Sequence, residues 1–474
     1  MSRSSSLTSY SLLVIVFSSL IFVGAMCTKE QPLSVKPVRL EYWHVFGHQE
    51  ALNRIGAAFK ERYPYVSINY RAFRQDEYER ELVNALAAGK GPDLFELHDT
   101  WMGVHEDKVL PLPPALTIPV FQQEGVLSKE VVARPGKMQT ITARQVRDLY
   151  VDVVAETVVR PPGSGAAGNI FGLPLALDTM VLYYNRDLLN AGGVSEPPRT
   201  WDELIGRDGA PGMIAKLTRY DARREVTQAA IALGGSYNID RAPDILSLLM
   251  LQNGAQMTDP QGRPTIDQRP PGWAGEGYPA LGALAFYADF ADPAKEETYT
   301  WSANFPEAIT AFANGKSAMA LGYAYHLPLI RARAPRMNLG WVSVPQVSTE
   351  YKTNYANFWV TSVSKQSPAP NEAWAFILFA ATERFATPTF NPPYLYATMA
   401  MRPVALRSLV DRQRADPAQE DMRIFAESVL TAKNWYRGKD PQGMEATLRQ
   451  AIQFVVDGTK SSRDAIDYIT QRTR

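Results

Sequence analysis

Two carboxylates, Asp99 and Asp178, occupy positions in the sequence from which a side chain could bind a polar ligand. Asp99 follows the end of a predicted strand at 92–97, and Asp178 lies between two sheet-forming runs. In a sugar site, a carboxylate accepts charge-assisted hydrogen bonds from adjacent hydroxyls, and these are stronger than neutral ones. The sequence therefore predicts that Asp99 and Asp178 contact ligand. A helix cap for Asp99 and a hinge ion pair for Asp178 are the structural alternatives.

Aromatic side chains are the second group with a chemical use. The chain is 11% aromatic, with nine Trp and 22 Tyr, and flat ring faces suit stacking on sugar rings. Most aromatic residues belong to cores, but Tyr323 and Trp101 follow strand ends, and Arg402 could reach a hydroxyl or an anionic group. The predicted stacking residues are Trp43, Trp101, Trp301, Tyr323, Tyr325, Trp359 and Trp435.

Four of the five histidines, His44, His48, His98 and His105, lie in the first 105 residues. Zinc needs three or four converging ligands, and Asp99 or Asp178 could add oxygen atoms. The offset of His44 and His48 on one loop favours side chains that face apart. We therefore predict His44 and His48 as hydrogen-bonding ligand contacts, and a metal-ion binding protein is the alternative.

An enzyme of carbohydrate breakdown is the less favoured alternative. A glycosidase needs two carboxyl groups about 5 to 10 Å apart across the scissile bond. Nothing in the sequence marks one carboxyl as the acid, and neither G-x-S-x-G nor H-E-x-x-H occurs. We predict a non-catalytic protein without a cofactor.

The elements that must position these residues begin with a repeated pattern. Alternating apolar residues at 38–42 and 66–70 predict strands, an apolar face at 49–63 predicts a helix, and a second helix at 76–88 precedes a strand at 92–97. This order opens a doubly wound parallel sheet. Ligands collect beyond the carboxyl ends of such strands, where residues 43–48 and 98–101 follow.

Size and charge limit the remaining possibilities. A chain of 474 residues exceeds what one core usually accommodates, so two lobes are expected. The 49 basic and 49 acidic residues cancel, so no nucleic-acid partner is indicated, and we expect a monomer. Segments 228–233 and 245–251 predict helices of a more helical second lobe.

The N-terminus predicts export. Residues 12–23 form an apolar run of signal-peptide length, and the only cysteine follows in the sequence Gly24-Ala25-Met26-Cys27. A lone cysteine beside such a run suggests lipidation. We predict a signal peptide at 1–27 and a polar tether at 28–37, with an uncleaved membrane segment as the competing anchor. Either arrangement places the body outside the cytoplasm.

Three passages carry a family resemblance: IFGLPLALDTMVLYYNRDL, AAGKGPDLFEL and AITAFANGKSAMALG. Their order and spacing resemble the family 1 extracellular solute-binding proteins of ABC importers, the maltodextrin-binding type. The resemblance implies a periplasmic-binding-protein-like α/β fold with two lobes, each with a doubly wound sheet, joined by a multi-crossing hinge. The implied lobes are 38–175 plus 357–393 and 176–345 plus 400–474.

The same resemblance implies a function. Members of the family bind a solute outside the cytoplasm and hand it to ABC permease subunits in the membrane, and this chain would bind a sugar or oligosaccharide. Tyr323 and Tyr325 stand where family members present aromatic residues to the ligand. Hinge crossings are expected near 174–178, 344–357 and 391–403.

Overall fold

The computed structural model describes residues 33–124, 130–160, 168–207, 209–259, 263–436 and 438–473. The predicted signal peptide, Cys27 and the start of the tether lie outside these ranges. Contacts divide the chain into two units, one of Met1–Lys36 with Thr117–Gly136 and one of Pro37–Leu116 with Lys137–Arg474.

The smaller unit contains most of a β-hairpin. Its strands are β4 (Ala115–Glu124) and β5 (Glu130–Gln139). The backbone N–H of Leu33 donates a hydrogen bond of 2.9 Å to the carbonyl of Ala133. The end of the predicted tether therefore contacts the second strand of the hairpin.

The first sheet of the larger unit contains the three strands expected from the start of the sequence. Its order is β17–β3–β1–β2, with bounds Trp359–Val363, Leu94–His98, Val38–His44 and Val66–Ala72. Strand β1 is parallel to β2 and β3, whereas β17 is antiparallel to β3. The predicted parallel opening is confirmed, and the fourth strand comes from much later in the chain.

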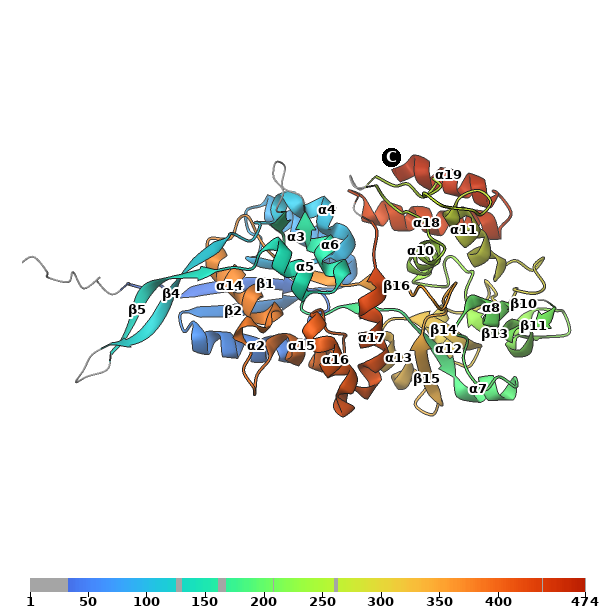
Figure 1. Ribbon diagram of the computed structural model, residues 1–474, viewed down its shortest axis with the longest axis horizontal. Helices are drawn as coiled ribbons and strands as arrows, with labels where there is room; N and C mark the ends of the chain where they lie inside the picture. Colours follow the sequence, from blue (N-terminus) through green and yellow to red (C-terminus); the bar gives the residue numbers. More distant parts are fainter. Residues whose placement is uncertain are drawn as a thin grey trace, which may run out of the picture. The chain divides into compact units, whose positions relative to one another are not determined.

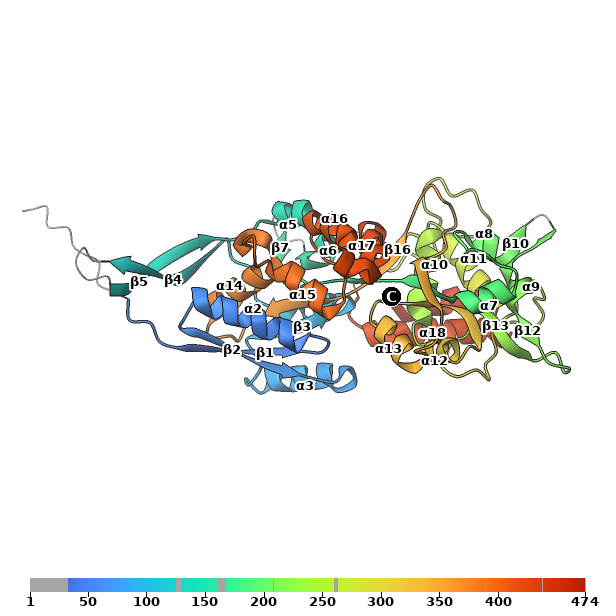
Figure 2. The same ribbon diagram turned by 90° about the horizontal axis from the view of Figure 1, so that it is seen from below.

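Helices cover both faces of this sheet, and together they form the first lobe. Helix α2 (Gln49–Arg62) and helix α3 (Gln75–Ala87) lie on opposite faces of the sheet (Figures 1 and 2). Helix α2 buries Leu52, Ile55 and Phe59, the apolar face expected from its sequence. Helices α14 (Pro370–Ala381) and α15 (Pro392–Ala400) pack beside it.

The second lobe is built on a mixed sheet. Its order is β12–β13–β14–β9–β15, with bounds Arg219–Tyr220, Val226–Ala232, Ser317–Gly322, Val181–Asn185 and Leu339–Ser343. The prediction of a helix at 228–233 is wrong, because residues 228–232 belong to β13, which is parallel to β14. A short apolar run buried on both faces has no periodicity that distinguishes a strand from a helix.

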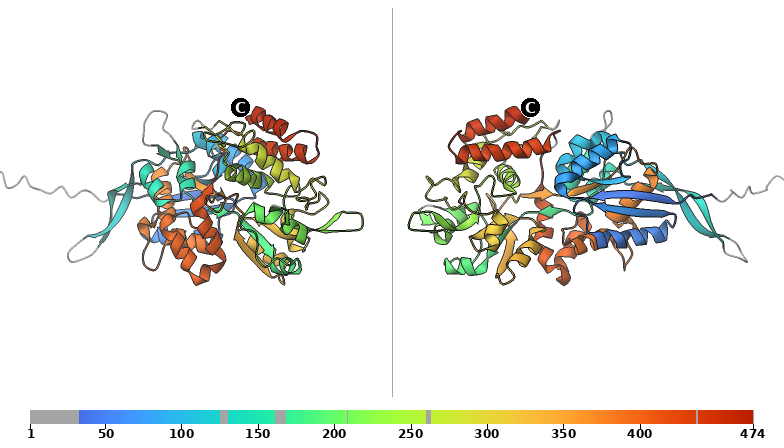
Figure 3. Two further views of the ribbon diagram at one scale, coloured as in Figure 1. Left: turned by 45° about the vertical axis from the view of Figure 1, so that its right-hand side comes forward. Right: turned by 180° about the vertical axis from the view of Figure 1, so that it is seen from behind.

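Helices pack on this sheet to complete the second lobe. The C-terminal pair α18 and α19 lies beside α10 and α11 (Figures 1 and 3). The bounds of α7 to α13, α18 and α19 are Arg186–Ala191, Trp201–Ile205, Met213–Leu217, Ala242–Gln252, Pro279–Asp289, Ala308–Ala313, His326–Arg333, Pro441–Val456 and Ser462–Thr473.

A small sheet joins the lobes. It has the order β18–β16–β8, with bounds Ala432–Lys433, Asn354–Asn357 and Asp178–Thr179. Strand β16 leads directly into β17 of the first lobe, and β8 leads into β9 of the second. Strand β8 lies at the end of the segment 174–178, and strand β16 lies within the segment 344–357; both segments were expected to cross between the lobes. The third strand lies later than the expected 391–403.

The segment 392–405 stays with the first lobe, so the chain leaves this lobe later than the predicted boundary at residue 400. Helix α15 packs on α2, and the N–H of Val151 donates to the carbonyl of Ala405 at 3.1 Å. Helices α16 (Arg407–Ala415) and α17 (Arg423–Ser428) follow, and α17 contacts β15 of the second lobe and β8. The crossing is thus completed only at β18.

Several short elements complete the larger unit. Helices α4 to α6 span Met102–His105, Ala143–Leu149 and Asp152–Val158, and two-stranded pairings join Val159–Arg160 with Asn169–Ile170 and Gly206–Arg207 with Ala210–Pro211. Within the described residues, no helix is long and apolar enough to span a membrane.

Candidate ligand-binding site

A cleft of about 1090 Å³ lies between the two lobes. Its first-lobe wall includes Phe46, Glu79, Glu96, His98, Trp101 and Trp359, its second-lobe wall includes Arg241, Asp244, Ser247, Tyr325, Gln442 and Glu445, and Asp178, Tyr355, Asn357, Arg402 and Trp435 come from the connecting segments. The carboxyl ends of β1 and β3 open into it. The cleft therefore lies beyond the carboxyl ends of parallel strands, where a ligand is expected to bind.

An aromatic cluster of Phe46, Trp101 and Trp359 forms much of the first-lobe wall. The Trp359 ring lies edge-to-face against Trp101 at 5.3 Å and against Phe46 at 5.9 Å between centroids. Trp359 is the first residue of β17 and pairs with His98 of β3, which fixes its position at the sheet edge. Phe46 is 54% exposed, so the cluster offers apolar surface to the cleft.

Asp178 is held at the hinge. Its Oδ1 accepts hydrogen bonds from the N–H groups of Ala324 at 2.8 Å and Thr179 at 3.0 Å. Its buried Oδ2 has no hydrogen-bond partner among the described residues and lies 3.5 Å from Nη1 of Arg402. Burial raises the pKa of Asp178 to about 6, and the charge of Arg402 opposes that shift. The predicted hinge ion pair and a ligand contact are therefore compatible.

Glu96 is a second buried carboxyl in the cleft wall. Its Oε1 accepts from the hydroxyl of Tyr42 and its Oε2 from the N–H of Val45, both at 3.1 Å. Burial raises the pKa of Glu96 to about 7, although both hydrogen bonds oppose the shift. A titrating carboxyl thus lies at the carboxyl end of the first sheet.

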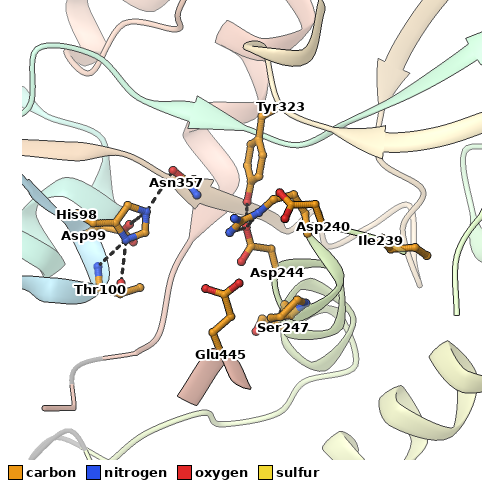
Figure 4. A network of polar contacts seen from close by, with 12 residues as sticks. His98, Asp99, Thr100, Ile239, Asp240, Asp244, Ser247, Tyr323, Asn357 and Glu445 are labelled. Carbon is orange, nitrogen blue, oxygen red and sulfur yellow. Dashed lines mark hydrogen bonds and ion pairs between the residues drawn. The ribbon is translucent and has the colours of Figure 1, made fainter. Parts of the chain in front are cut away.

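The second-lobe wall contains an ionic network (Figure 4). Asp244 Oδ2 accepts from the hydroxyl of Tyr323 at 2.7 Å and from the guanidinium of Arg241, with Nε at 2.9 Å and Nη2 at 2.5 Å. Trp435 donates from Nε1 to Ser247 Oγ at 3.0 Å. These bonds fix the polar groups of α10 in place before any ligand binds.

One hydrogen bond joins the two walls at α3 and α18. Gln442 Nε2 donates to Glu79 Oε2 at 2.6 Å, and His105 Nε2 lies 2.9 Å from Glu79 Oε1. The bond belongs to a conformation in which these two helices approach one another across the cleft. Hinge closure of this kind encloses ligand in two-lobed proteins.

Six of the predicted ligand contacts line the cleft: Trp101, Asp178, Tyr325, Trp359, Arg402 and Trp435. Tyr325 stacks on Tyr323 with centroids 5.6 Å apart, and the guanidinium of Arg402 lies 5.5 Å from the Tyr325 ring centroid. Strand ends and connecting segments bring these residues together from both lobes.

The other six predicted contacts lie outside this lining. In the first lobe, Trp43 packs against Phe73 and Arg71, His44 is buried below the wall, and His48 caps helix α2. Asp99 accepts a hydrogen bond from Asn434 Nδ2. In the second lobe, Trp301 donates to Asn238 inside the core, and Tyr323 is fully buried behind Tyr325. Each side chain is satisfied or enclosed by the protein. Neighbouring residues on a strand or turn face opposite ways, which the sequence pattern did not resolve.

The histidines have separate structural roles. His48 Nδ1 accepts from the N–H of Ala51, and His98 contacts Thr100, Asn357 and Asp99. Among the described residues, no group of three or more His, Cys, Asp or Glu side chains could hold a metal ion. The convergence that would favour the metal-binding alternative is therefore not found in this part of the chain.

Several cleft residues were missed by sequence reasoning. Glu96 had a detectable signal, because it is the one charged residue within the strand Leu94–His98. Arg241 and Asp244 carried none, since Pro243 and the charges read as an ordinary helix start. Tyr355 and Asn357 had no signal until their strand was placed in the linking sheet.

The sequence profile for bacterial extracellular solute-binding proteins matches residues 47–386. This chain belongs to that family. A binding protein of Brucella abortus (strain 2308), BAB2_0491, is 22% identical over 326 residues, which cover 68% of this chain and 66% of that protein. The chain thus spans slightly less than two thirds of that relative. The maltotriose-binding protein of Pyrococcus abyssi (strain GE5 / Orsay) is 25% identical over 28% of this chain and 21% of its own length.

Solved structures of this type have the same fold. The GacH receptor of Streptomyces glaucescens GLA.O, solved unliganded and with acarbose, superposes with a TM-score of 0.64 at 16% identity over 92% of this chain and 97% of that one. A cyclo/maltodextrin-binding protein with maltotetraose gives a TM-score of 0.65 at 14% identity over 93% and 97%. The two-lobed periplasmic-binding-protein fold predicted from the sequence is confirmed.

Proposed function

We propose that this chain is the extracytoplasmic, non-catalytic binding component of an ABC importer and that its ligand is a sugar or oligosaccharide. The observation that carries the proposal is the cleft between the lobes, which combines an aromatic wall with buried carboxyls. Aromatic faces supply apolar contact, and a few fixed polar groups orient the ligand. This combination suits a molecule with apolar ring faces and many hydroxyls.

The second-lobe wall supports the same ligand class. Its polar groups, Arg241, Asp244 and Ser247, are held in one geometry by bonds within the protein. Preorganised groups lose little freedom on binding, which favours affinity. Related proteins of known ligand point in the same direction: the relative from Pyrococcus is a maltotriose-binding protein, and the structural neighbours were solved with acarbose and maltotetraose.

The test is calorimetry of the full chain with maltose, maltotetraose and mannobiose, followed by Trp359→Ala. Trp359 is the centre of the aromatic cluster, and loss of a buried aromatic contact at a binding site costs about 2 kcal/mol or more. We expect the dissociation constant of the best sugar to rise roughly 30-fold.

Trp341→Ala is the matched control for this experiment. Trp341 is a partly buried tryptophan on strand β15, where its ring contacts Arg331 and its Nε1 donates to the carbonyl of Asp421. It is not part of the cleft wall, so its loss should leave affinity unchanged. Equal weakening by the two variants, or no sugar binding by the unaltered chain, would contradict the proposal.

We also propose a membrane anchor at Cys27, a monomeric binding protein and permease subunits as its partners. The support for the anchor is the lone cysteine beside the apolar run 12–23. Expression in a host that processes lipoproteins should give a membrane-associated product that incorporates radiolabelled fatty acid. The Cys27→Ala variant should show no incorporation, and labelling of that variant would refute lipidation at this residue.

A further inference from the structure

We propose that Glu96 contacts the ligand and determines specificity: it accepts hydrogen bonds from a ligand that is uncharged or bears an amino group, and it excludes ligands with a carboxylate or phosphate group. This inference rests on the proposed function, since it names the class of sugar that the cleft takes.

The geometry of Glu96 leaves room for a ligand. The side chain lines the cleft, and each carboxyl oxygen has one protein donor, Tyr42 on Oε1 and Val45 on Oε2. A carboxylate has about four acceptor positions. At least one position on each oxygen therefore remains for donors from the cleft, such as sugar hydroxyls or an ammonium group.

The charges around Glu96 favour donors over anions. No basic side chain forms an ion pair with Glu96 in the described part of the chain. The two partly buried arginines of the cleft walls are already paired, since Arg241 lies 2.5 Å from Asp244 and Arg402 lies 3.5 Å from Asp178. Two further arginines at the cleft are largely exposed and form weaker surface pairs, Arg74 with Asp76 at 2.8 Å and Arg80 with Glu81 at 3.5 Å. An anionic ligand would meet a buried acidic group and no unpaired arginine on these walls.

A purely structural role for Glu96 is the competing explanation, because the two bonds also fix the end of β1. Glu96→Gln separates the two roles. The amide oxygen can accept from the N–H of Val45 while the amide nitrogen donates to Tyr42 Oη, so both bonds can persist without the charge. Tyr42 can then donate to Thr361 Oγ1, which lies 2.9 Å away.

The experiment measures dissociation constants of the full chain at pH 8.5, above the raised pKa of Glu96, as wild type and as Glu96→Gln. The probes are maltotetraose and mannobiose as neutral sugars, chitobiose with free amino groups as a cationic sugar, and digalacturonate as an anionic one. We expect wild type to bind a neutral or amino sugar and to reject digalacturonate. Glu96→Gln should raise the dissociation constant of the preferred sugar about tenfold. It should also reduce the ratio between the dissociation constants of digalacturonate and the preferred sugar.

Asp93→Asn is the matched control. Asp93 is also a buried carboxyl that accepts from a backbone N–H, that of Glu41 at 2.9 Å, but it lies at the opposite end of β3 from the cleft. Its substitution should lower the melting temperature and leave sugar affinity and discrimination unchanged.

The outcomes separate the two proposals. If wild type binds a neutral or amino sugar and Glu96→Gln binds it equally well, Glu96 is structural and this inference fails while the proposed function stands. Preference of wild type for digalacturonate would also overturn the inference alone. If wild type binds none of the sugars, the proposed function fails and the inference fails with it.

Discussion

Asp178→Ala is expected to abolish tight sugar binding and to lower the stability of the protein. The substitution leaves Arg402 without its carboxylate and the N–H of Ala324 without its acceptor. Removing one member of a buried ion pair costs about 3 to 5 kcal/mol. Loss of a charged acceptor for ligand hydroxyls adds roughly 10- to 100-fold in the dissociation constant. Calorimetry and urea denaturation measure the two effects.

Asp178→Asn provides the comparison for this prediction. The asparagine oxygen can still accept from the N–H of Ala324, so only the part of the stability loss that comes from that bond should return. Arg402 still lacks its carboxylate, and the charge that faces the ligand is lost. We expect binding by Asp178→Asn to stay weaker than wild type and to discriminate less among sugar epimers. Wild-type affinity in both variants would show that Asp178 serves the hinge only.

The contribution of Glu96 and Asp178 to the stability of the folded protein should fall as pH rises from about 4 to 7, whereas buried His326, whose pKa is lowered to about 3, contributes in the opposite direction. Burial raises the pKa of Glu96 to about 7 and that of Asp178 to about 6, above their ordinary values of 4.5 and 3.8. At a pH between the ordinary and the raised pKa of each carboxyl, the folded protein retains a proton that the unfolded chain has released. At these two carboxyls the unfolded state then binds fewer protons, so their contribution to the free energy of unfolding decreases with rising pH.

Glu96→Gln isolates one part of this effect. Its side chain does not ionise, so the difference in unfolding free energy between wild type and variant should change by roughly 3 kcal/mol between pH 4.5 and 7. Wild type should gain stability relative to the variant as the pH falls towards 4.5. Urea denaturation at several pH values measures it, and a difference that is independent of pH would contradict a raised pKa at Glu96.

The sequence determined the start of the fold because its signals are local. Alternation at Val38, Leu40 and Tyr42 predicts a strand whatever surrounds it, and strand β1 begins at Val38. The apolar face at Leu52, Ile55 and Phe59 likewise predicts helix α2. The charge of Asp178 between two sheet-forming runs marked the hinge for the same reason, since a buried carboxylate between strands needs a partner.

Tertiary structure decided what depends on distant segments. Residues 228–232 form a strand because β14 lies beside them, and no local periodicity records that neighbour. Tyr323 faces Asp244 inside the second lobe while Tyr325 faces the cleft, although both follow the same strand. Glu96 had a local signal as the one charged residue of its strand, but its place in the cleft wall depends on the second lobe and the connecting segments. A site between two lobes is made of residues far apart in sequence, and their approach depends on packing that local patterns do not contain.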